Sequence, residues 1–417
     1  MNTSYIKDKW PMHVFFISQG ISMFGVGYTA LPMLLLVLWL CWITIKTPGM
    51  FKDLFTDDRC YWVWIYYLLF IVMVIISDLA VGGKLTHLDG PLYGLSLGVY
   101  MLLGYLVARI YNLDEVLMLA HRWLALWLFL LLVVAEIYYH EIYRYHHGIF
   151  AHTHVFFSGL VMIALVNVVF LIERFEYKRI LSWFSCILAL WALFSVYKYS
   201  ISDIVPHLFM AGTILVMLLS DKRYSMYILT VLILGGALSA ALDPQILSKL
   251  QAVNLIPQDL WMNLLNHRES VWTASLRILG QHPFLGIGSG NFNPVCKEIL
   301  AKMGALNSEN FAHTHNIFFQ CAVAHGLIAG FAFIGLILSG FRLAIRSLKT
   351  VSNESMTWAV FSILFVYVLH GLVDVAPYNE EIIPFIWGSV GLLMGMVVKE
   401  AKTDERNFKG KCHHTRI

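Results

Sequence analysis

The chain contains 417 residues, of which 59% are hydrophobic and only 13% are charged. Soluble domains carry about 25% charged residues, so this composition excludes an ordinary soluble protein. The formal net charge of +3 says little about partners and gives no reason to expect a nucleic acid. The six cysteines form no Cys-x-x-Cys pair, so we expect neither a disulfide framework nor a zinc site.

Apolar runs long enough to cross a bilayer recur along the sequence. They predict an all-α, polytopic integral membrane protein with about twelve transmembrane helices. Glycines and Pro32 interrupt the first two runs, so the alternative there is one long tilted helix over residues 13–46. The runs lie at residues 13–28, 30–46, 61–77, 91–108, 117–138, 151–172, 180–197, 204–220, 226–243, 315–341, 356–372 and 382–398.

The basic residues predict the orientation of these helices, because cytoplasmic loops are enriched in Lys and Arg. With twelve spans both termini share one side, and 20 of the 29 Lys and Arg residues fall on it, against eight on the other. We therefore expect cytoplasmic termini and a basic cytoplasmic tail at 399–417 that could touch anionic membrane lipid. The remaining chain divides into transmembrane helices 1–9 within residues 1–243, a large exoplasmic loop at 244–314, and helices 10–12 within 315–398.

The long loop has the pattern of a folded segment. Its apolar residues recur at helical spacing and predict an amphipathic helix over residues 258–279, with Gly280 as its C-cap. Arg268 and Arg277 flank this helix. They form either a solvated polar face or an anion site, since guanidinium groups present a fork of donors to phosphate oxygens. The following GIGSG segment (286–290) offers either a tight turn or backbone N–H groups for an anion.

Histidines mark the point at which the loop returns to the apolar region. The sequence HTHN places His313 and His315 two residues apart, beside Asn316. Imidazole titrates near neutral pH and can act as a general base or donate a hydrogen bond. His315 is therefore the candidate base, and His313 is either its partner or merely exposed.

Further polar residues fall on the same predicted side of the membrane. A group of histidines within residues 140–154 has irregular spacing, which favours an interfacial loop or substrate contacts over a metal site. Lys198 ends the seventh span, where it either snorkels to the interface or holds a phosphate. His370 and Asp374 end the eleventh span, where they complete a polar cavity or cap the helix.

At the loop the chain resembles the O-antigen ligase and polymerase superfamily of bacterial membrane glycosyltransferases. The resemblance rests on Arg268 ahead of Trp272, on the sequence HPFLGIGSGNF, and on a His–Asn pair that leads an apolar span. Ligases of this family carry a His, then Asn, Ser or Gln, nine residues, and Gly-x-x-Gly-Thr. Here His315 and Asn316 precede nine residues and Gly326, whereas alanine and glycine stand where the family has its final Gly and Thr.

The resemblance implies a glycosyltransferase that uses a polyprenyl-diphosphate-linked donor, needs no metal and carries no cofactor. It implies that the loop histidine, here His315, activates the acceptor hydroxyl. It also implies that arginines hold the donor diphosphate, with Arg268 as the match in the loop and Arg277 as a weaker candidate. Lys198 stands nearest to the place of a second family arginine. The other sequence candidates for substrate binding are His313, Asn316 and Asp374.

We therefore expect an inner-membrane O-antigen ligase that transfers a glycan from undecaprenyl diphosphate to a sugar hydroxyl of the lipid A core, at the periplasmic face. An O-antigen polymerase, which shares the implied fold and donor and extends a growing glycan, is the alternative within the enzyme class. A polysaccharide transporter or flippase is the alternative outside that class. It predicts internal repeats and broken or charged helices near the membrane midplane, whereas the polar groups here gather at the exoplasmic edge.

Overall fold

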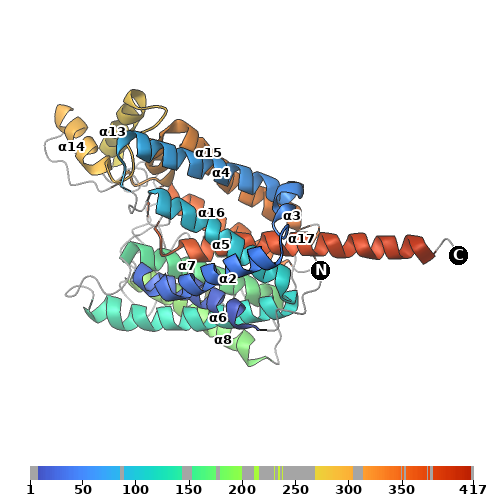
Figure 1. Ribbon diagram of the computed structural model, residues 1–417. Helices are drawn as coiled ribbons and strands as arrows, with labels where there is room; N and C mark the ends of the chain where they lie inside the picture. Colours follow the sequence, from blue (N-terminus) through green and yellow to red (C-terminus); the bar gives the residue numbers. More distant parts are fainter. Residues whose placement is uncertain are drawn as a thin grey trace.

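Figure 1 shows the computed structural model, a bundle of long helices with a small helical subdomain at one end. Every regular element in the described residues is helical. The structure describes residues 8–84, 89–142, 153–174, 179–199, 211–215, 230, 233–234, 237, 268–303, 313–348, 350–351, 354–372, 374–375 and 379–414. Its helices are α1 (Trp10–Ile21), α2 (Ala30–Lys46), α3 (Lys52–Thr56), α4 (Asp58–Val81), α5 (Pro91–Ile110), α6 (Leu113–Val134), α7 (Thr153–Arg174), α8 (Ile180–Tyr199), α13 (Arg268–Gln281), α14 (Phe292–Lys302), α15 (Ile317–Ser347), α16 (Ser355–Gly371) and α17 (Ile383–His414).

Eight helices in the described part of the chain are long and apolar enough to cross a membrane. The prediction of an all-helical membrane protein is thereby confirmed, whereas the count of twelve stays a prediction. Helix α16 is apolar but slightly shorter than these eight. The predicted spans at 204–220 and 226–243 lie almost entirely outside the described residues, as do the first residues of the predicted loop, 244–267.

The first two predicted runs form two helices, so the alternative of one long tilted helix is wrong. Helix α1 ends at Ile21, and two short 3₁₀ turns lead into α2. Gly25 lies between these turns with φ +148°, a backbone conformation that interrupts a helix and favours glycine. With 12 residues, α1 is about 18 Å long. This is shorter than the roughly 30 Å hydrocarbon core, so α1 does not cross it alone.

The bundle is built from pairs of closely packed helices (Figure 1). Helix α4 runs along α15, and α5 runs along α17. Helix α7 packs against α6, α8 and α16 and is buried along its whole apolar length. A π-helical segment, Ala135–Ile142, extends α6 toward the end of α8. Helix α2 is the least buried of the candidate spans, as expected for a helix at the rim of the bundle.

Charged side chains close the end of the bundle from which α17 projects. Lys9 pairs with Glu115 at 2.9 Å, and Arg109 pairs with Asp53 at 3.1 Å. The start of α1 and the end of α17 lie at this end, whereas α13 and α14 lie at the opposite end (Figure 1). Helix α17 continues without interruption through the predicted tail as far as His414. The subdomain and these ion pairs thus occupy opposite ends of the bundle.

Glycines allow the close approach of α5 and α17. A Cβ added at Gly391 would lie 2.1 Å from the backbone oxygen of Met101, and one added at Gly104 would lie 2.2 Å from that of Gly388. Small residues at such contacts let the two backbones touch, which is a common way for helices to associate in membranes.

We expect Gly391→Ala to destabilise the fold by about 1–3 kcal/mol, because an added methyl group there forces α5 and α17 apart. The melting temperature of the detergent-solubilised protein measures this effect. Gly280→Ala is the matched control, since Gly280 is exposed on α13 and an added Cβ would meet nothing within 4 Å. Equal melting temperatures for the two variants would contradict the prediction.

Candidate functional site

The predicted loop contains a folded subdomain formed by α13 and α14 against the start of α15. Its buried core includes Val271 and Ile278 of α13, Phe292 of α14 and Val323 of α15. The amphipathic helix is thereby confirmed from residue 268, while 258–267 lies outside the described residues. The core fixes the orientation of α13 relative to the bundle.

The predicted C-cap at Gly280 is wrong, because α13 continues through it to Gln281. The N–H group of His282 still donates to the carbonyl of Ile278 at 2.8 Å. The next residue, Pro283, has no N–H group to donate, so the proline ends the helix.

Helix α15 is broken at Gly326, where φ is +87°. The backbone N–H groups of Ile287 and Gly288, from the GIGSG segment, donate to the carbonyls of Val323 and Ala324 at 3.0 and 2.8 Å. The segment therefore supplies hydrogen bonds where the regular pattern of the helix is interrupted. This exchange ties the subdomain to the membrane helix at the level of the backbone.

The GIGSG segment acts as a structural turn rather than an anion cradle. The N–H of Gly286 donates to the carbonyl of His282, and that of Ser289 donates to the Asp78 carboxylate at 2.8 Å. Together with the two bonds to α15, the N–H groups of residues 286–289 all have partners inside the protein. A bound anion would have to displace them.

Residues 313–316 form a rigid corner in front of α15. The Asn316 side chain caps α15 by accepting hydrogen bonds from the N–H groups of Phe318 and Phe319, and its amide donates to the carbonyl of Leu372 at 3.0 Å. This is the usual role of asparagine at an N-cap. These contacts account for Asn316 structurally, and its predicted contact with substrate stays a prediction.

His315 has an unusual backbone conformation. Its φ is +53°, and it is the one non-glycine residue with a positive φ in the described part of the chain. A residue with a Cβ is held in this region only where its neighbours fix it, and such residues cluster at functional sites. The conformation brings the His313 and His315 rings together, with centroids 4.3 Å apart.

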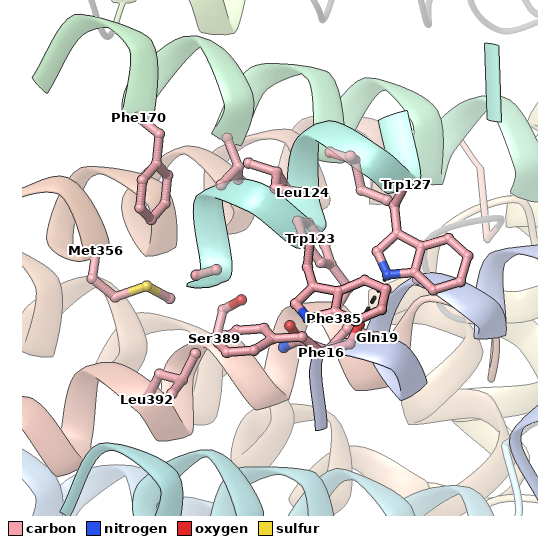
Figure 2. Close-up of a pocket in the computed structure, with 14 residues that line it drawn as sticks. Phe16, Gln19, Trp123, Leu124, Trp127, Phe170, Met356, Phe385, Ser389 and Leu392 are labelled. Carbon is pink, nitrogen blue, oxygen red and sulfur yellow. Dashed lines mark hydrogen bonds between the residues drawn. The ribbon is translucent and has the colours of Figure 1, made fainter. Parts of the chain in front are cut away.

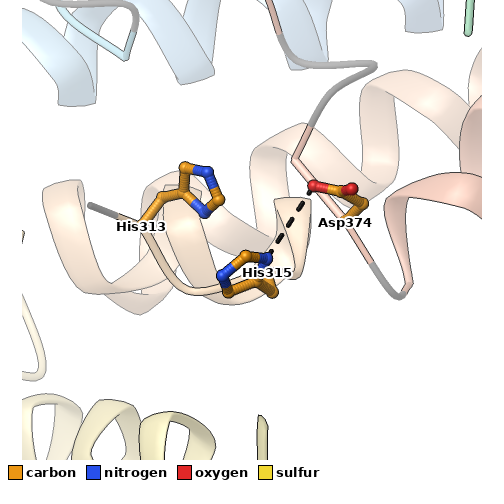
Figure 3. A group of neighbouring side chains, drawn as sticks. All are labelled: His313, His315 and Asp374. Atoms are coloured by element: carbon orange, nitrogen blue, oxygen red, sulfur yellow. Dashed lines mark ion pairs between the residues drawn. The ribbon is translucent and has the colours of Figure 1, made fainter. Parts of the chain in front are cut away.

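The tertiary structure brings Asp374 to this corner (Figure 3). Its Oδ1 lies 3.9 Å from Nδ1 of His315, and the two side chains are 12% and 28% exposed. Its Oδ2 lies 4.0 Å from Nε2 of His370, one turn earlier on α16. The carboxylate therefore faces an imidazole that is partly open to solvent.

Arg268 completes the group from α13. Burial lowers the pKa of its guanidinium group, whereas the negative charge of Asp374 raises it. Arginine stays charged throughout the physiological range, so this half-buried cation lies within electrostatic reach of the Asp374 carboxylate. Trp272, one turn further along α13, donates from Nε1 to the carbonyl of Thr314 at 3.0 Å. That bond fixes α13 against the histidine corner.

Two other predicted binding residues lie elsewhere. Arg277 is exposed, and its separation of nine positions from Arg268, about two and a half helical turns, places the two side chains on opposite faces of α13. The Lys198 ammonium lies over the rings of Phe194 and Tyr199 on α8, 5.1 Å from each centroid. The structure therefore gathers Arg268, His313, His315, Asn316 and Asp374, but it does not bring Arg277 to them.

A second polar cluster, which the sequence reasoning missed, joins the π-helical segment to α8. Glu136, on the π-helical segment, accepts hydrogen bonds from Trp191, Ser195 and Tyr199. The available signal was an acidic residue at the end of an apolar run, which is a candidate for function by default.

A third cluster, also missed, lies buried behind the site. Asp78 and His325 have fully buried side chains, with 3.6 Å between Oδ1 and Nδ1. Asp89 and Gln320 are joined by a 2.7 Å hydrogen bond and are both about 1% exposed. Ionisable residues inside or beside apolar runs were again the available signal.

His313, His315 and Asp374 also form a ligand set that a transition metal accepts. One atom from each lies within 4.8 Å of the others. A tetrahedral zinc site places its ligand atoms roughly 3.3–3.4 Å apart, so binding would require the side chains to close in. The guanidinium charge of Arg268 near Asp374 opposes a cation there.

Two cavities are lined by other parts of the bundle. One of about 30 Å³ lies between α1, α6 and α17, beside Gln19, Trp123 and Ser389 (Figure 2). It has room for little more than a water molecule. A larger apolar crevice of about 580 Å³ is lined by residues such as Leu40 and Phe55, near the end of the bundle that carries the Arg109–Asp53 pair. Neither cavity is lined by Arg268, His315 or Asp374.

Comparison of the sequence with protein-family models gives no match, and comparison with curated proteins gives no significantly similar relative. The assignment of a function therefore depends on the residues and their geometry. The feature that these provide is an arginine, a histidine and an aspartate from three separate segments, gathered at one end of a membrane bundle.

Proposed function

We propose that the chain is a glycosyltransferase that moves a glycan from undecaprenyl diphosphate to a sugar hydroxyl, with O-antigen ligation to the lipid A core as its specific reaction. One observation carries the proposal: Arg268, His315 and Asp374 meet although they are far apart in the sequence. These three groups supply a cation for phosphate, a base, and a carboxylate that orients the base.

The reaction requires a base for the acceptor hydroxyl. In the proposed step His315 takes the hydroxyl proton as the acceptor oxygen bonds to the anomeric carbon. Asp374 lies on the Nδ1 side of the ring, so it would hold the proton on Nδ1, leave Nε2 facing the acceptor, and stabilise the imidazolium that forms. Geometry of this kind is what makes a histidine an effective general base.

The other half of the reaction is departure of the lipid diphosphate. The bond from the anomeric carbon to the diphosphate oxygen breaks, and the bonding electrons remain on the leaving group. A half-buried guanidinium stabilises that developing negative charge through paired N–H donors. In this proposal α13 and the Trp272–Thr314 hydrogen bond hold Arg268 beside the leaving group.

The proposed location is the bacterial inner membrane, with cytoplasmic termini and the site at the periplasmic face. The unequal distribution of Lys and Arg along the sequence supports this orientation. The position of the subdomain at the opposite end of the bundle from the start of α1 and the end of α17 also supports it. The lipid part of the donor would lie among the apolar helices, and its diphosphate would reach the subdomain.

In a strain that lacks the gene, we expect core-only lipopolysaccharide and accumulated undecaprenyl-linked polymer. The wild-type gene should restore the ladder on a gel, whereas His315→Ala and Asp374→Asn should not, because loss of a general base costs about 10²–10⁴-fold in rate. His282→Ala and Glu298→Gln are matched controls, since both side chains are exposed in the same subdomain.

The lipopolysaccharide pattern on the gel also separates a ligase from a polymerase and from a transporter. Core carrying a single repeat unit in the deletion strain would identify a polymerase instead of a ligase. An unchanged ladder would exclude both enzymes and favour a transporter.

The two loop arginines should behave differently. We expect Arg268→Ala to lower the transfer rate of purified protein about 10²-fold, because a preorganised donor to the leaving group is lost. Arg277→Ala should retain activity, because Arg277 is exposed on the opposite face of α13. Initial rates with a lipid-diphosphate donor measure both. Equal losses in the two variants would show that the face of α13 that carries Arg268 does not bind the donor.

We expect transfer to continue after exhaustive treatment with a chelator, because the proposed base and guanidinium act without a metal ion. The measurement is the initial rate before and after chelation, with metal content determined by mass spectrometry. Loss of activity that zinc restores would instead assign His313, His315 and Asp374 as metal ligands.

A further inference from the structure

We propose that a buried network of polar groups positions His315, with Gln320 as the residue that connects this polar network to the site. The inference depends on the proposed role of His315 as the base. It assigns a purpose to Asp89, His325 and Asp78, which the proposed reaction does not use.

The polar network begins at Thr314, the residue before His315. Its N–H donates to Oε1 of Gln320 at 3.1 Å, and its hydroxyl donates to the carbonyl of Asn316 at 2.6 Å. Its carbonyl accepts the bond from Trp272. Thr314 is completely buried, and Asn316 is fixed as the N-cap of α15.

His315 is thereby held from both sides in its left-handed conformation. Such a conformation costs free energy for a residue with a Cβ, so the surroundings must impose it. Because the peptides on either side are anchored, the direction in which the His315 side chain leaves the backbone is set. This direction is what brings Nδ1 toward Asp374.

Gln320 connects Thr314 to the protein interior through two hydrogen bonds. Its Nε2 donates to Oδ2 of Asp89 at 2.7 Å, and both residues are about 1% exposed. The two ends of the amide have opposite requirements, because one faces an N–H donor and the other faces a carboxylate. Glutamine satisfies both requirements at once.

The other end of the polar network connects Gln320 to three segments. His325 Nε2 lies 2.6 Å from the carbonyl of Asp89, at the start of α5, and its Nδ1 lies 3.6 Å from Asp78 at the end of α4. Asp78 accepts hydrogen bonds from the backbone and hydroxyl groups of Ser289, in the GIGSG turn. A buried polar group without its partner is costly, so these groups hold one another in place.

An exchange of the hydrogen-bond donor and acceptor between Gln320 and Asp89 tests the polar network. Gln320→Glu keeps the acceptor for Thr314 but places a second carboxylate against Asp89. Adding Asp89→Asn restores one donor and one acceptor, with their direction reversed. We expect Gln320→Glu to lower the transfer rate at saturating donor about a hundredfold, since small displacements of catalytic groups have effects of that size. The KM for the donor should stay the same, and the double variant should regain most of the rate.

Two further variants guard against a general loss of structure. Trp272→Phe keeps the ring that packs near Phe319 but removes the donor to Thr314. Because the same bond also holds α13 and with it Arg268, the readout for this variant is the rate at which diethyl pyrocarbonate modifies His315, which should rise. Ser275→Ala is the control, because this buried hydroxyl bonds only to Val271 within α13 in the contacts described. If Gln320→Glu does not fold, the double variant and Trp272→Phe still test the proposal.

A measurement that needs no glycan transfer separates this inference from the proposed function. The rate at which diethyl pyrocarbonate modifies His315, read by tandem mass spectrometry, should rise several-fold in Gln320→Glu and return in the double variant. If the wild-type chain transfers no glycan, the proposed function fails while this pattern still tests the positioning. The inference would be overturned if His315 in Gln320→Glu were modified at the wild-type rate. It would also be overturned if the double variant folded but transferred glycan as slowly as Gln320→Glu.

Discussion

The structure depends on one backbone constraint, the break of α15 at Gly326. Within a membrane protein, each backbone polar group that leaves the helical pattern needs another partner. Here the turn before α14 provides partners by donating from Ile287 and Gly288 to the carbonyls beside the break. A Cβ at Gly326 would lie 2.0 Å from the carbonyl oxygen of Phe284, so the two segments meet only because the residue is glycine.

That junction also organises the candidate site. It fixes the start of α15, and therefore the cap at Asn316 and the corner that carries His315. It fixes the subdomain, and therefore the direction from which Arg268 approaches. Asp374 arrives separately from the end of α16 and is joined to the same corner through the Asn316–Leu372 bond. The proposed chemistry thus depends on rigid elements that meet at one end of the bundle.

The sequence predicted those features that follow from local patterns. Apolar runs located the long helices, because each must match the thickness of a bilayer. Helical spacing located α13, and the grouping of unusual polar residues selected Arg268 and His315. The same local reasoning misplaced the end of α13 at Gly280, because a glycine stops a helix only where the next turn is not otherwise held. It also kept Arg277 as a weaker binding candidate beside Arg268, since charge alone does not show which side of a helix faces the bundle.

By itself, the sequence determined the class of protein, most of its helices and the segment that holds the candidate site. Only the tertiary structure decided which residues meet, because contacts between positions such as 78, 289 and 325 depend on packing across the whole bundle. It moved Asp374 from a possible helix cap to the partner of His315. It also converted the GIGSG segment from a possible anion cradle into a structural turn. The physical reason is that a residue's type sets the interactions it can make, whereas the fold sets which partners come within reach.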